Sequence, residues 1–177
     1  MPPSTLLVGM GNPILRDDAV GVRLAREIAR RLGPVPGLGV LEECSVGGLG
    51  LLDVVKGFER VVVLDSIKAG GPPGHWYRFG GAALRPTMNL RNVHDVNFAT
   101  ALELGRRLGV RVPADSDVHV FAVEVLDNTT FDAQMTAPVE ACLAGCAEEI
   151  AREIAQLLTV PPRRRLKRPG DPVHVTK

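Results

Sequence analysis

Apolar residues in this chain form short runs that alternate with stretches of helical spacing. The run Arg60–Leu64 ends in VVVL without a polar break, which is typical of a strand buried on both faces of a sheet. From Asp18 to Leu32 apolar residues instead recur every three or four positions, which predicts a helix that Gly33 ends. The predicted strands are Thr5–Met10, Gly39–Cys44, Arg60–Leu64, His75–Phe79 at an edge, and Val118–Val125; the predicted helices are Asp18–Leu32, Leu49–Lys56, Asp95–Leu108 and Ala137–Leu158. This alternation predicts a three-layer α/β/α sandwich around a mostly parallel twisted sheet with right-handed crossovers.

The composition indicates a globular protein with an aliphatic core. Of the 177 residues, 45% are hydrophobic but only 4% are aromatic. No apolar run reaches membrane-spanning length, and the start MPPSTLL has neither the basic nor the apolar region of a signal peptide. We therefore expect a cytoplasmic protein without membrane contact. The three cysteines, Cys44, Cys142 and Cys146, are odd in number and form no CxxC motif, which favours buried thiols over disulfides.

The charge is divided unevenly along the chain. From Val160 onward there are six basic residues and one acidic residue, so this tail carries +5 while the whole chain carries +1. The tail also contains four prolines. We expect a single α/β domain over residues 1–159 and a disordered, solvated tail over residues 160–177. Because the body is acidic and has no basic face with aromatic residues, we expect no nucleic-acid partner. We also expect the protein to be a monomer.

The segment from Gly9 to Gly21, GMGNPILRDDAVG, directly follows the first predicted strand. A glycine turn at a strand tip directs the next residues to the carboxyl edge of the sheet, where α/β proteins place their sites. Here the turn brings Asp17 and Asp18 to that edge. A single aspartate is enough to cap the following helix, so the adjacent pair indicates that at least one of the two has a function.

Further polar residues are expected at the same edge. They are Glu42, Glu43 and Cys44 on the second strand, Asp65 and Ser66 after the third, Asn92–Asp95 before a helix, and Glu124 on the last strand. Asp65 follows four apolar residues, so we expect it where the buried strand opens to the site, because a carboxylate inside the sheet would be costly. Asp18, Asp65 and His94 together offer two carboxylates and an imidazole, which is enough for a metal site with open positions.

Other chemistries have less support in the sequence. It contains no GxSxG elbow and no P-loop, and Ser66 has no matched histidine. Gly9-Met10-Gly11 begins like a dinucleotide-binding GxGxxG motif, but Ile14 stands in the place of the third glycine. Asp17 and Asp18 would also place negative charge where a pyrophosphate must bind.

These residues carry a resemblance to a known family. The segment GMGNPILRDDAVGVR resembles the GxGNxxxxDDxxGxR signature of the [NiFe]-hydrogenase maturation endopeptidases. The similarity continues in the family's order through SVGGLGLLD, VVVLDSI, NVHDV, FAVEV and MTAPVEACL. It spans residues Leu6 to Leu158 and leaves the basic tail outside.

The resemblance implies an activity. Members of that family remove a C-terminal extension from the hydrogenase large subunit after nickel has been installed, and the cut follows a basic position just past the last metal-binding cysteine motif. The partner implied is therefore the precursor of a [NiFe]-hydrogenase large subunit, and the implied metal-binding positions are Asp18, Asp65 and His94. The implied fold is a twisted sheet flanked by helices. The chain departs from the family after its second strand, where Glu42-Glu43-Cys44-Ser45 replaces the frequent Asp-Gly-Gly.

Three mechanisms are open at this point. In the first, which the resemblance favours, Asp18, Asp65 and His94 contact nickel that the precursor supplies and thereby license cleavage. In the second, a divalent metal held by the same three residues activates water or polarises the scissile carbonyl. In the third, Asp18 and Asp65 act as an aspartyl protease pair that shares a proton. The alternative function is a non-proteolytic nickel-sensing or chaperone-like module, which would leave the mass of the bound precursor unchanged.

Overall fold

The computed structural model describes residues 4–47, 49–84 and 93–162, with the backbone alone for residues 84 and 93–97. Five strands form one sheet in the order β2-β1-β3-β5-β4. Their bounds are β1 Thr5–Met10, β2 Leu38–Cys44, β3 Arg60–Ile67, β4 Trp76–Gly80 and β5 Val118–Glu124. Neighbouring strands are parallel except that the edge strand β4 is antiparallel to β5. The prediction of a mostly parallel sheet with His75–Phe79 near an edge is confirmed.

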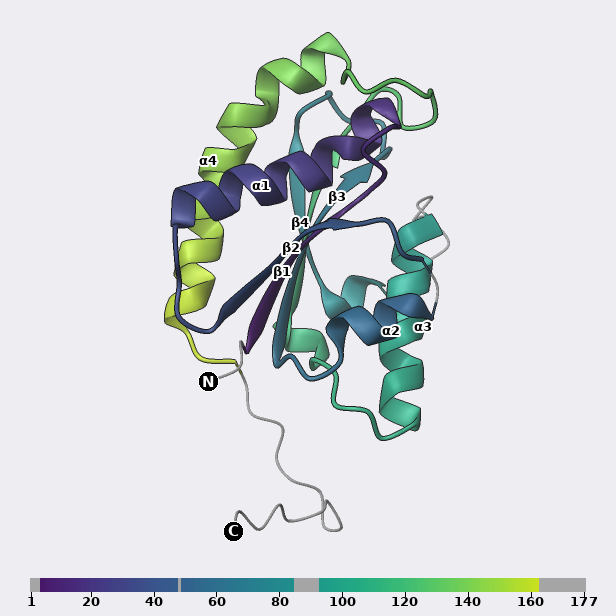
Figure 1. The fold of residues 1–177 in the computed structure, drawn as a ribbon. Helices are drawn as coiled ribbons and strands as arrows, with labels where there is room; N and C mark the ends of the chain where they lie inside the picture. Colours follow the sequence, from purple (N-terminus) through teal and green to yellow (C-terminus); the bar gives the residue numbers. More distant parts are fainter. Residues whose placement is uncertain (1–3, 48, 85–92, 163–177) are drawn as a thin grey trace.

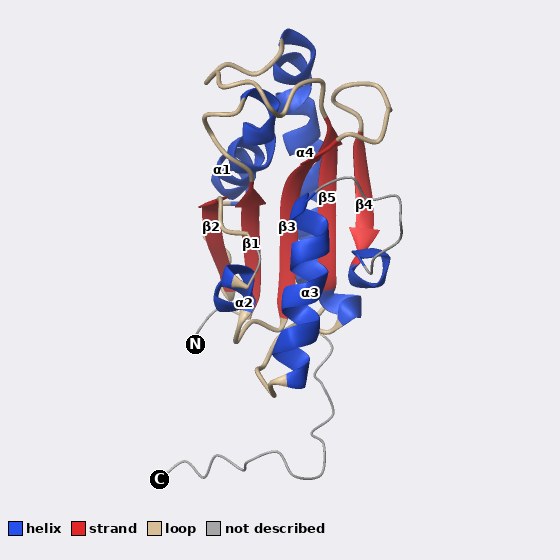
Figure 2. Ribbon diagram, turned by 90° about the vertical axis from the view of Figure 1, so that its right-hand side faces the viewer, coloured by secondary structure: helices blue, strands red, loops and turns tan. Residues whose placement is uncertain are grey.

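Helices cover both faces of this sheet (Figure 1). The helices are α1 Val20–Leu32, α2 Gly50–Val55, α3 Val93–Arg107 and α4 Ala137–Thr159. Figure 1 shows α1 and α4 on one face and α2 and α3 on the other, and Figure 2 shows α2 and α3 in front of the five strands. The three-layer α/β/α class predicted from the sequence is therefore confirmed. None of the helices in the described part of the chain is both long and apolar enough to cross a membrane.

The sheet separates two aliphatic cores, as the unbroken apolar runs predict. In β3, Val61 and Val63 pack in the core beneath α2 and α3, whereas Val62 and Leu64 pack in the core beneath α1 and α4. Successive side chains of a strand point to opposite faces, so a central strand needs apolar residues at every position. All eight residues of β3 are buried.

Three of the predicted boundaries that differ from the observed ones bear on the candidate site. The helix expected from Asp18 begins with a 3₁₀ turn, Arg16–Ala19, before α1. The strand expected to end at Leu64 continues to Ile67, because residues 65–67 keep their register with residues 122–124 of β5. The expectation that Asp65 follows the strand is therefore wrong. The helix expected from Asp95 begins at Val93, which places the backbone of His94 inside the first turn of α3.

The strand order creates a switch point between β1 and β3. The chain leaves β1 through α1 on one face to reach β2, and it returns through α2 on the other face to reach β3 on the opposite side of β1. Connections that depart to opposite faces leave a crevice at the carboxyl ends of the strands. Asp18, which follows β1, and Asp65, near the end of β3, flank this switch point.

Arg60, at the start of β3, is buried and fixes the end of α4. Its Nη1 donates to the carbonyl oxygens of Leu157 and Val160 at 2.7 and 2.8 Å. Its Nη2 lies 3.5 Å from the Asp117 carboxylate, which is also buried. Val160, the first residue assigned to the basic tail, thus contacts the body, and residues 163–177 lie outside the described residues.

Two truncations measure what the tail contributes. Removing residues 163–177 is expected to change the melting temperature by no more than about 1 °C, because the tail has no apolar periodicity with which to join the core. Ending the chain at Thr159 removes one acceptor of Arg60 and is expected to cost about 1 kcal/mol of unfolding free energy. Thermal melts of both variants beside the full chain measure the difference. A loss of several degrees from the shorter deletion alone would contradict this expectation.

Candidate active site

The turn after β1 depends on close backbone contacts that glycine permits. Gly11 has a φ of 131°, and a Cβ there would collide with the carbonyl oxygen of Asp18. A Cβ at Gly21 would collide with the carbonyl oxygens of Met10 and Leu64, so the start of α1 lies directly against the ends of β1 and β3. The glycines of the opening motif therefore bring the residues between them onto the carboxyl edge of the sheet.

Asp18 is held in one orientation by neutral donors. The Asn12 N–H donates to its Oδ2 at 2.7 Å, and the Ser66 hydroxyl donates to its Oδ1 at 3.0 Å. The residue is only 5% exposed. No cationic side chain among the described residues forms an ion pair with it. Asp18 therefore presents a fixed, buried carboxylate beside the end of β3.

Asp65 also contacts Ser66, but through the backbone of that serine. The Ser66 N–H donates to its Oδ1 at 2.7 Å, and the residue is 1% exposed. By the alternation along β3, Asp65 faces the α2–α3 side of the sheet with Val63, whereas Ser66 faces the α1 side. Asp18 and Asp65 therefore both contact Ser66, the first through the serine hydroxyl and the second through the serine N–H. Both carboxylates are buried, and local donors compensate part of the desolvation cost.

Asp17 has a different environment from its neighbour. It is fully buried, and its Oδ2 accepts the N–H groups of Leu126 and Asp127 at 3.1 and 3.0 Å. The N–H of Thr136 donates to Oδ1 at 2.7 Å, and the Thr136 hydroxyl donates to Oδ2 at 2.9 Å. Asp17 therefore ties the loop between β5 and α4 to the turn after β1. This contact, rather than a simple helix cap, accounts for one member of the aspartate pair.

The third predicted ligand, His94, has only its backbone placed, in the first turn of α3. Its side chain lies outside the described residues, so the predicted triad is described for its two carboxylates alone. Within the residues that are described, no three His, Cys, Asp or Glu side chains form a cluster that could hold a metal ion.

Glu124 binds the loop after β3 at the same edge of the sheet. The residue is 2% exposed, and its Oε1 accepts the N–H groups of Ala69 and Gly70, both at 2.9 Å. Its Oε2 is also buried, beside the hydroxyl of Tyr77. Desolvation raises the pKa of Tyr77, and the neighbouring Glu124 carboxylate raises it further. Glu124 thus holds the glycine-rich loop after β3; the sequence signal was an acidic residue at the end of an apolar strand.

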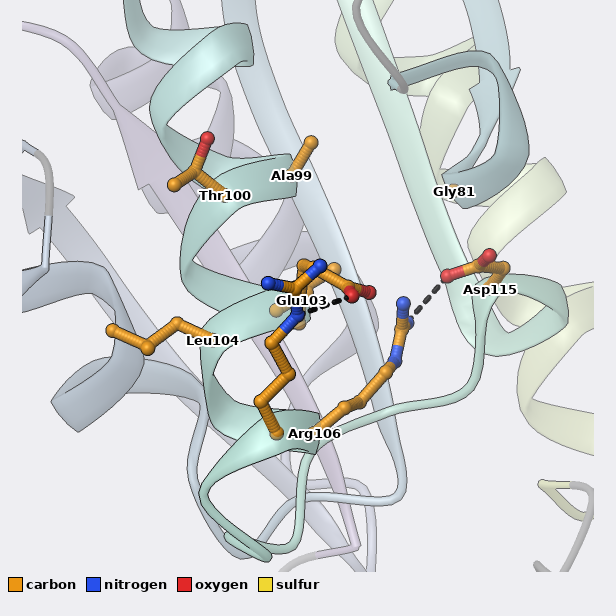
Figure 3. Close-up of a pocket in the computed structure, with 9 residues that line it drawn as sticks. Gly81, Ala99, Thr100, Glu103, Leu104, Arg106 and Asp115 are labelled. Atoms are coloured by element: carbon orange, nitrogen blue, oxygen red, sulfur yellow. Dashed lines mark hydrogen bonds and ion pairs between the residues drawn. The ribbon is translucent and has the colours of Figure 1, made fainter.

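A cavity of about 540 Å³ lies elsewhere on the molecule (Figure 3). Residues of α3 line it together with Gly81 and Asp115, and Arg106 forms an ion pair with Asp115 across it. Because Asp115 precedes β5, this cavity lies toward the amino ends of the strands. Neither Asp18 nor Asp65 lines it, so the cavity is separate from the candidate site.

Comparison with known proteins decides the family. The family model described as hydrogenase maturation protease matches residues 22–153, which is most of the chain. The chain belongs to the hydrogenase maturation protease family. It is therefore a peptide-bond hydrolase by family, and the resemblance predicted from the motifs is confirmed. The matched range includes Asp65 and His94 and begins just after Asp18.

Solved structures of hydrogenase maturation proteases share the fold. HybD, the hydrogenase maturating endopeptidase from E. coli, superposes with a TM-score of 0.70 at 20% identity, over 89% of this chain and 94% of that chain. The [NiFe] hydrogenase maturation protease HybD from Thermococcus kodakarensis gives a TM-score of 0.62 at 23% identity, over 88% and 99%. HycI from Thermococcus kodakarensis KOD1 gives 0.64 at 21% identity, over 88% and 92%. No curated protein matches the sequence.

A protease of this family could use a thiol nucleophile, but the cysteines here are poorly suited to that role. Burial raises the pKa of Cys44, and the Asp65 carboxylate raises it further. Burial likewise raises the pKa of Cys146 to about 11. Thiols with a raised pKa are protonated near neutral pH, and a protonated thiol is a weak nucleophile.

We therefore expect turnover to be independent of the thiols. The triple variant Cys44→Ala, Cys142→Ser, Cys146→Ala should lose about 1–3 kcal/mol of stability through cavities, while its folded fraction keeps its kcat. Activity is measured per folded molecule, with circular dichroism giving the folded fraction. Irreversible inactivation by alkylation of Cys44 alone, at an unchanged melting curve, would instead indicate a cysteine mechanism.

Proposed function

We propose that this protein is the endopeptidase that removes the C-terminal extension of a [NiFe]-hydrogenase large-subunit precursor after nickel insertion. One observation carries the proposal: two buried carboxylates at the switch point of the sheet both contact Ser66, Asp18 through the serine hydroxyl and Asp65 through the serine N–H. In a chain of the hydrogenase maturation protease family, this is where a processing site is expected. Buried carboxylates gathered at a sheet edge are costly for the fold, which supports a functional reason for their placement.

The side chains proposed as metal ligands suit an ion that arrives with the substrate. Both oxygens of Asp18 accept only neutral donors, so its charge has no cationic partner among the described residues. We propose that Asp18, Asp65 and the imidazole of His94 contact nickel bound in the precursor. Two carboxylates and one imidazole form an incomplete ligand set, and the precursor's own ligands would complete the coordination. Weak binding of free divalent metals to the isolated protein follows from the same reasoning.

Such a contact would couple cleavage to metal loading. A precursor with nickel in place supplies a cation for the Asp18 carboxylate, and an empty precursor does not. The bond energy of this contact positions the scissile segment at the sheet edge, where an attacking water can be oriented. The hydrogen bonds that fix both oxygens of Asp18 favour a positioning carboxylate over a member of a proton-sharing aspartyl pair.

Metal removal separates recognition of the substrate's nickel from catalysis by a resident metal. We expect chelator-treated enzyme still to cut a nickel-loaded precursor, as measured by the mass of the large subunit. We expect added nickel not to promote cutting of a precursor whose nickel site has been mutated. Loss of activity on chelation, restored by metal whatever the precursor carries, would contradict nickel recognition. An unchanged mass of the loaded precursor with untreated enzyme would contradict the proposed function itself.

A further inference from the structure

Exposed apolar side chains gather at the same edge as the candidate site. Eight large hydrophobic side chains are exposed among the described residues. Five of them lie in the loops that follow β1, β2 and β5: Ile14, Val46, Leu49, Leu126 and Phe131. Phe131 is 78% exposed, although the chain has only five phenylalanines and buries Phe98 and Phe121. Large apolar side chains exposed beside a site are often part of an interaction surface.

Three of these side chains, Ile14, Leu126 and Phe131, stand on one rigid unit, here called the apolar rim. Leu15 forms an isolated bridge with Phe131, the Arg16 N–H donates to the carbonyl oxygen of Asp132 at 2.8 Å, and the Asp132 N–H donates to that of Ile14 at 3.0 Å. The buried carboxylate of Asp17 accepts the N–H of Leu126. The rim is therefore preorganised, and binding through it costs little ordering entropy.

The charged side chains around the rim are paired with one another. Arg16 lies between two carboxylates, with its Nη2 at 3.0 Å from Asp132 and its Nε at 3.8 Å from Asp127. What remains for a partner is apolar surface with an aromatic anchor. An exposed aromatic side chain on a fixed loop is the kind of group that carries much of the binding energy of a protein interface.

We propose that the apolar rim binds an apolar surface of the folded large-subunit precursor, next to the segment that is cut. This inference rests on the proposed function. The precursor is the partner we expect at the rim, because the rim adjoins the candidate site. Asp17 fixes the rim, and the next residue, Asp18, belongs to the site. A precursor whose scissile segment reaches Asp18 must lie across these loops. The basic tail is a poor match, because it leaves the body at the end of α4, near Arg60, and offers few apolar residues.

The test compares two exposed apolar residues. Phe131→Ser is expected to raise the KM for the nickel-loaded precursor at least about tenfold and to leave kcat unchanged. Leu108→Ser is the matched control, because Leu108 is 65% exposed and follows the far end of α3. It should change neither parameter. Equal KM values for wild type and Phe131→Ser would overturn the inference.

A binding measurement keeps this result separate from catalysis. Binding is measured with a nickel-loaded precursor whose scissile bond resists cleavage, and Phe131→Ser should weaken its binding relative to wild type by about the same factor as the KM effect. If wild type cuts the precursor but Phe131→Ser does not alter binding, only the rim assignment fails. If wild type cuts nothing, the proposed function fails instead. Self-association of wild type that Phe131→Ser abolishes, with KM unchanged, would assign the rim to a second copy of this chain and overturn the inference.

Discussion

Replacing Asp65 or Asp18 with asparagine is expected to lower kcat/KM for the nickel-loaded precursor at least about a thousandfold while the protein stays folded. Asparagine keeps the shape of each side chain. At position 65 its carbonyl oxygen still accepts the Ser66 N–H, and at position 18 it still accepts the Asn12 N–H while the Ser66 hydroxyl rotates to accept from the amide. The substitution removes the negative charge and turns one acceptor oxygen into an amide donor. Cleavage is measured by the mass of the large subunit, and folding by thermal melts.

His94→Ala is expected to have the same effect on cleavage, because the resemblance places the third contact there. Each substitution is a separate test of its residue. Full activity of any one variant would remove that residue from the site. The control for all three is Glu103→Gln, which changes an exposed carboxylate of α3 that pairs with Arg107 away from this edge.

In contrast to these variants, Asp17→Ala is expected to lower the stability of the fold, with a loss of about 3–5 kcal/mol of unfolding free energy. The alanine would leave the N–H groups of Leu126, Asp127 and Thr136 without their acceptor beneath a closed loop. Denaturant unfolding of Asp17→Ala and Asp18→Ala, followed by fluorescence of the single tryptophan, measures both losses on one scale. Asp18→Ala should lose much less stability, because fewer groups donate to Asp18.

The same experiment also tests which of the two aspartates is the functional one. If Asp17→Asn abolished cleavage at an unchanged unfolding midpoint while Asp18→Asn remained active, Asp17 would be the functional residue. The geometry argues against that result, since all of the bonds to Asp17 come from the loop between β5 and α4.

The sequence predicts this fold well where apolar patterning decides the structure. The strand Thr5–Met10 is found with its predicted bounds, and the helix predicted over Ala137–Leu158 extends by one residue. Patterning fails where a polar residue is buried by partners distant in the chain. Asp65 ended the predicted strand because its side chain is charged, yet register with β5 carries the strand through it to Ile67. Single-chain patterning contains no information on that pairing.

For the candidate site, too, local motifs predicted some features, and others depend on contacts between distant parts of the chain. The glycine turn placed Asp17 and Asp18 at the sheet edge, but their different roles depend on Leu126, Asp127 and Thr136, which no local motif connects to them. The bond from the Ser66 hydroxyl to Asp18 likewise requires the tertiary structure. Phe131 carried no signal, because a single aromatic residue in a loop reads the same whether it is buried or exposed.

The contacts of Asp17 also bear on when the enzyme becomes competent during synthesis. Its partners follow it by 109, 110 and 119 residues, so the turn that carries Asp18 receives its support only after the start of α4 has been made. Contacts of such long sequence separation form late, because the intervening chain must first be ordered. A nascent chain that ends before Thr136 already contains Asp18, Asp65 and His94 but lacks the anchor of the turn that carries Asp18. We therefore expect proteolytic competence only after nearly the whole domain has left the ribosome.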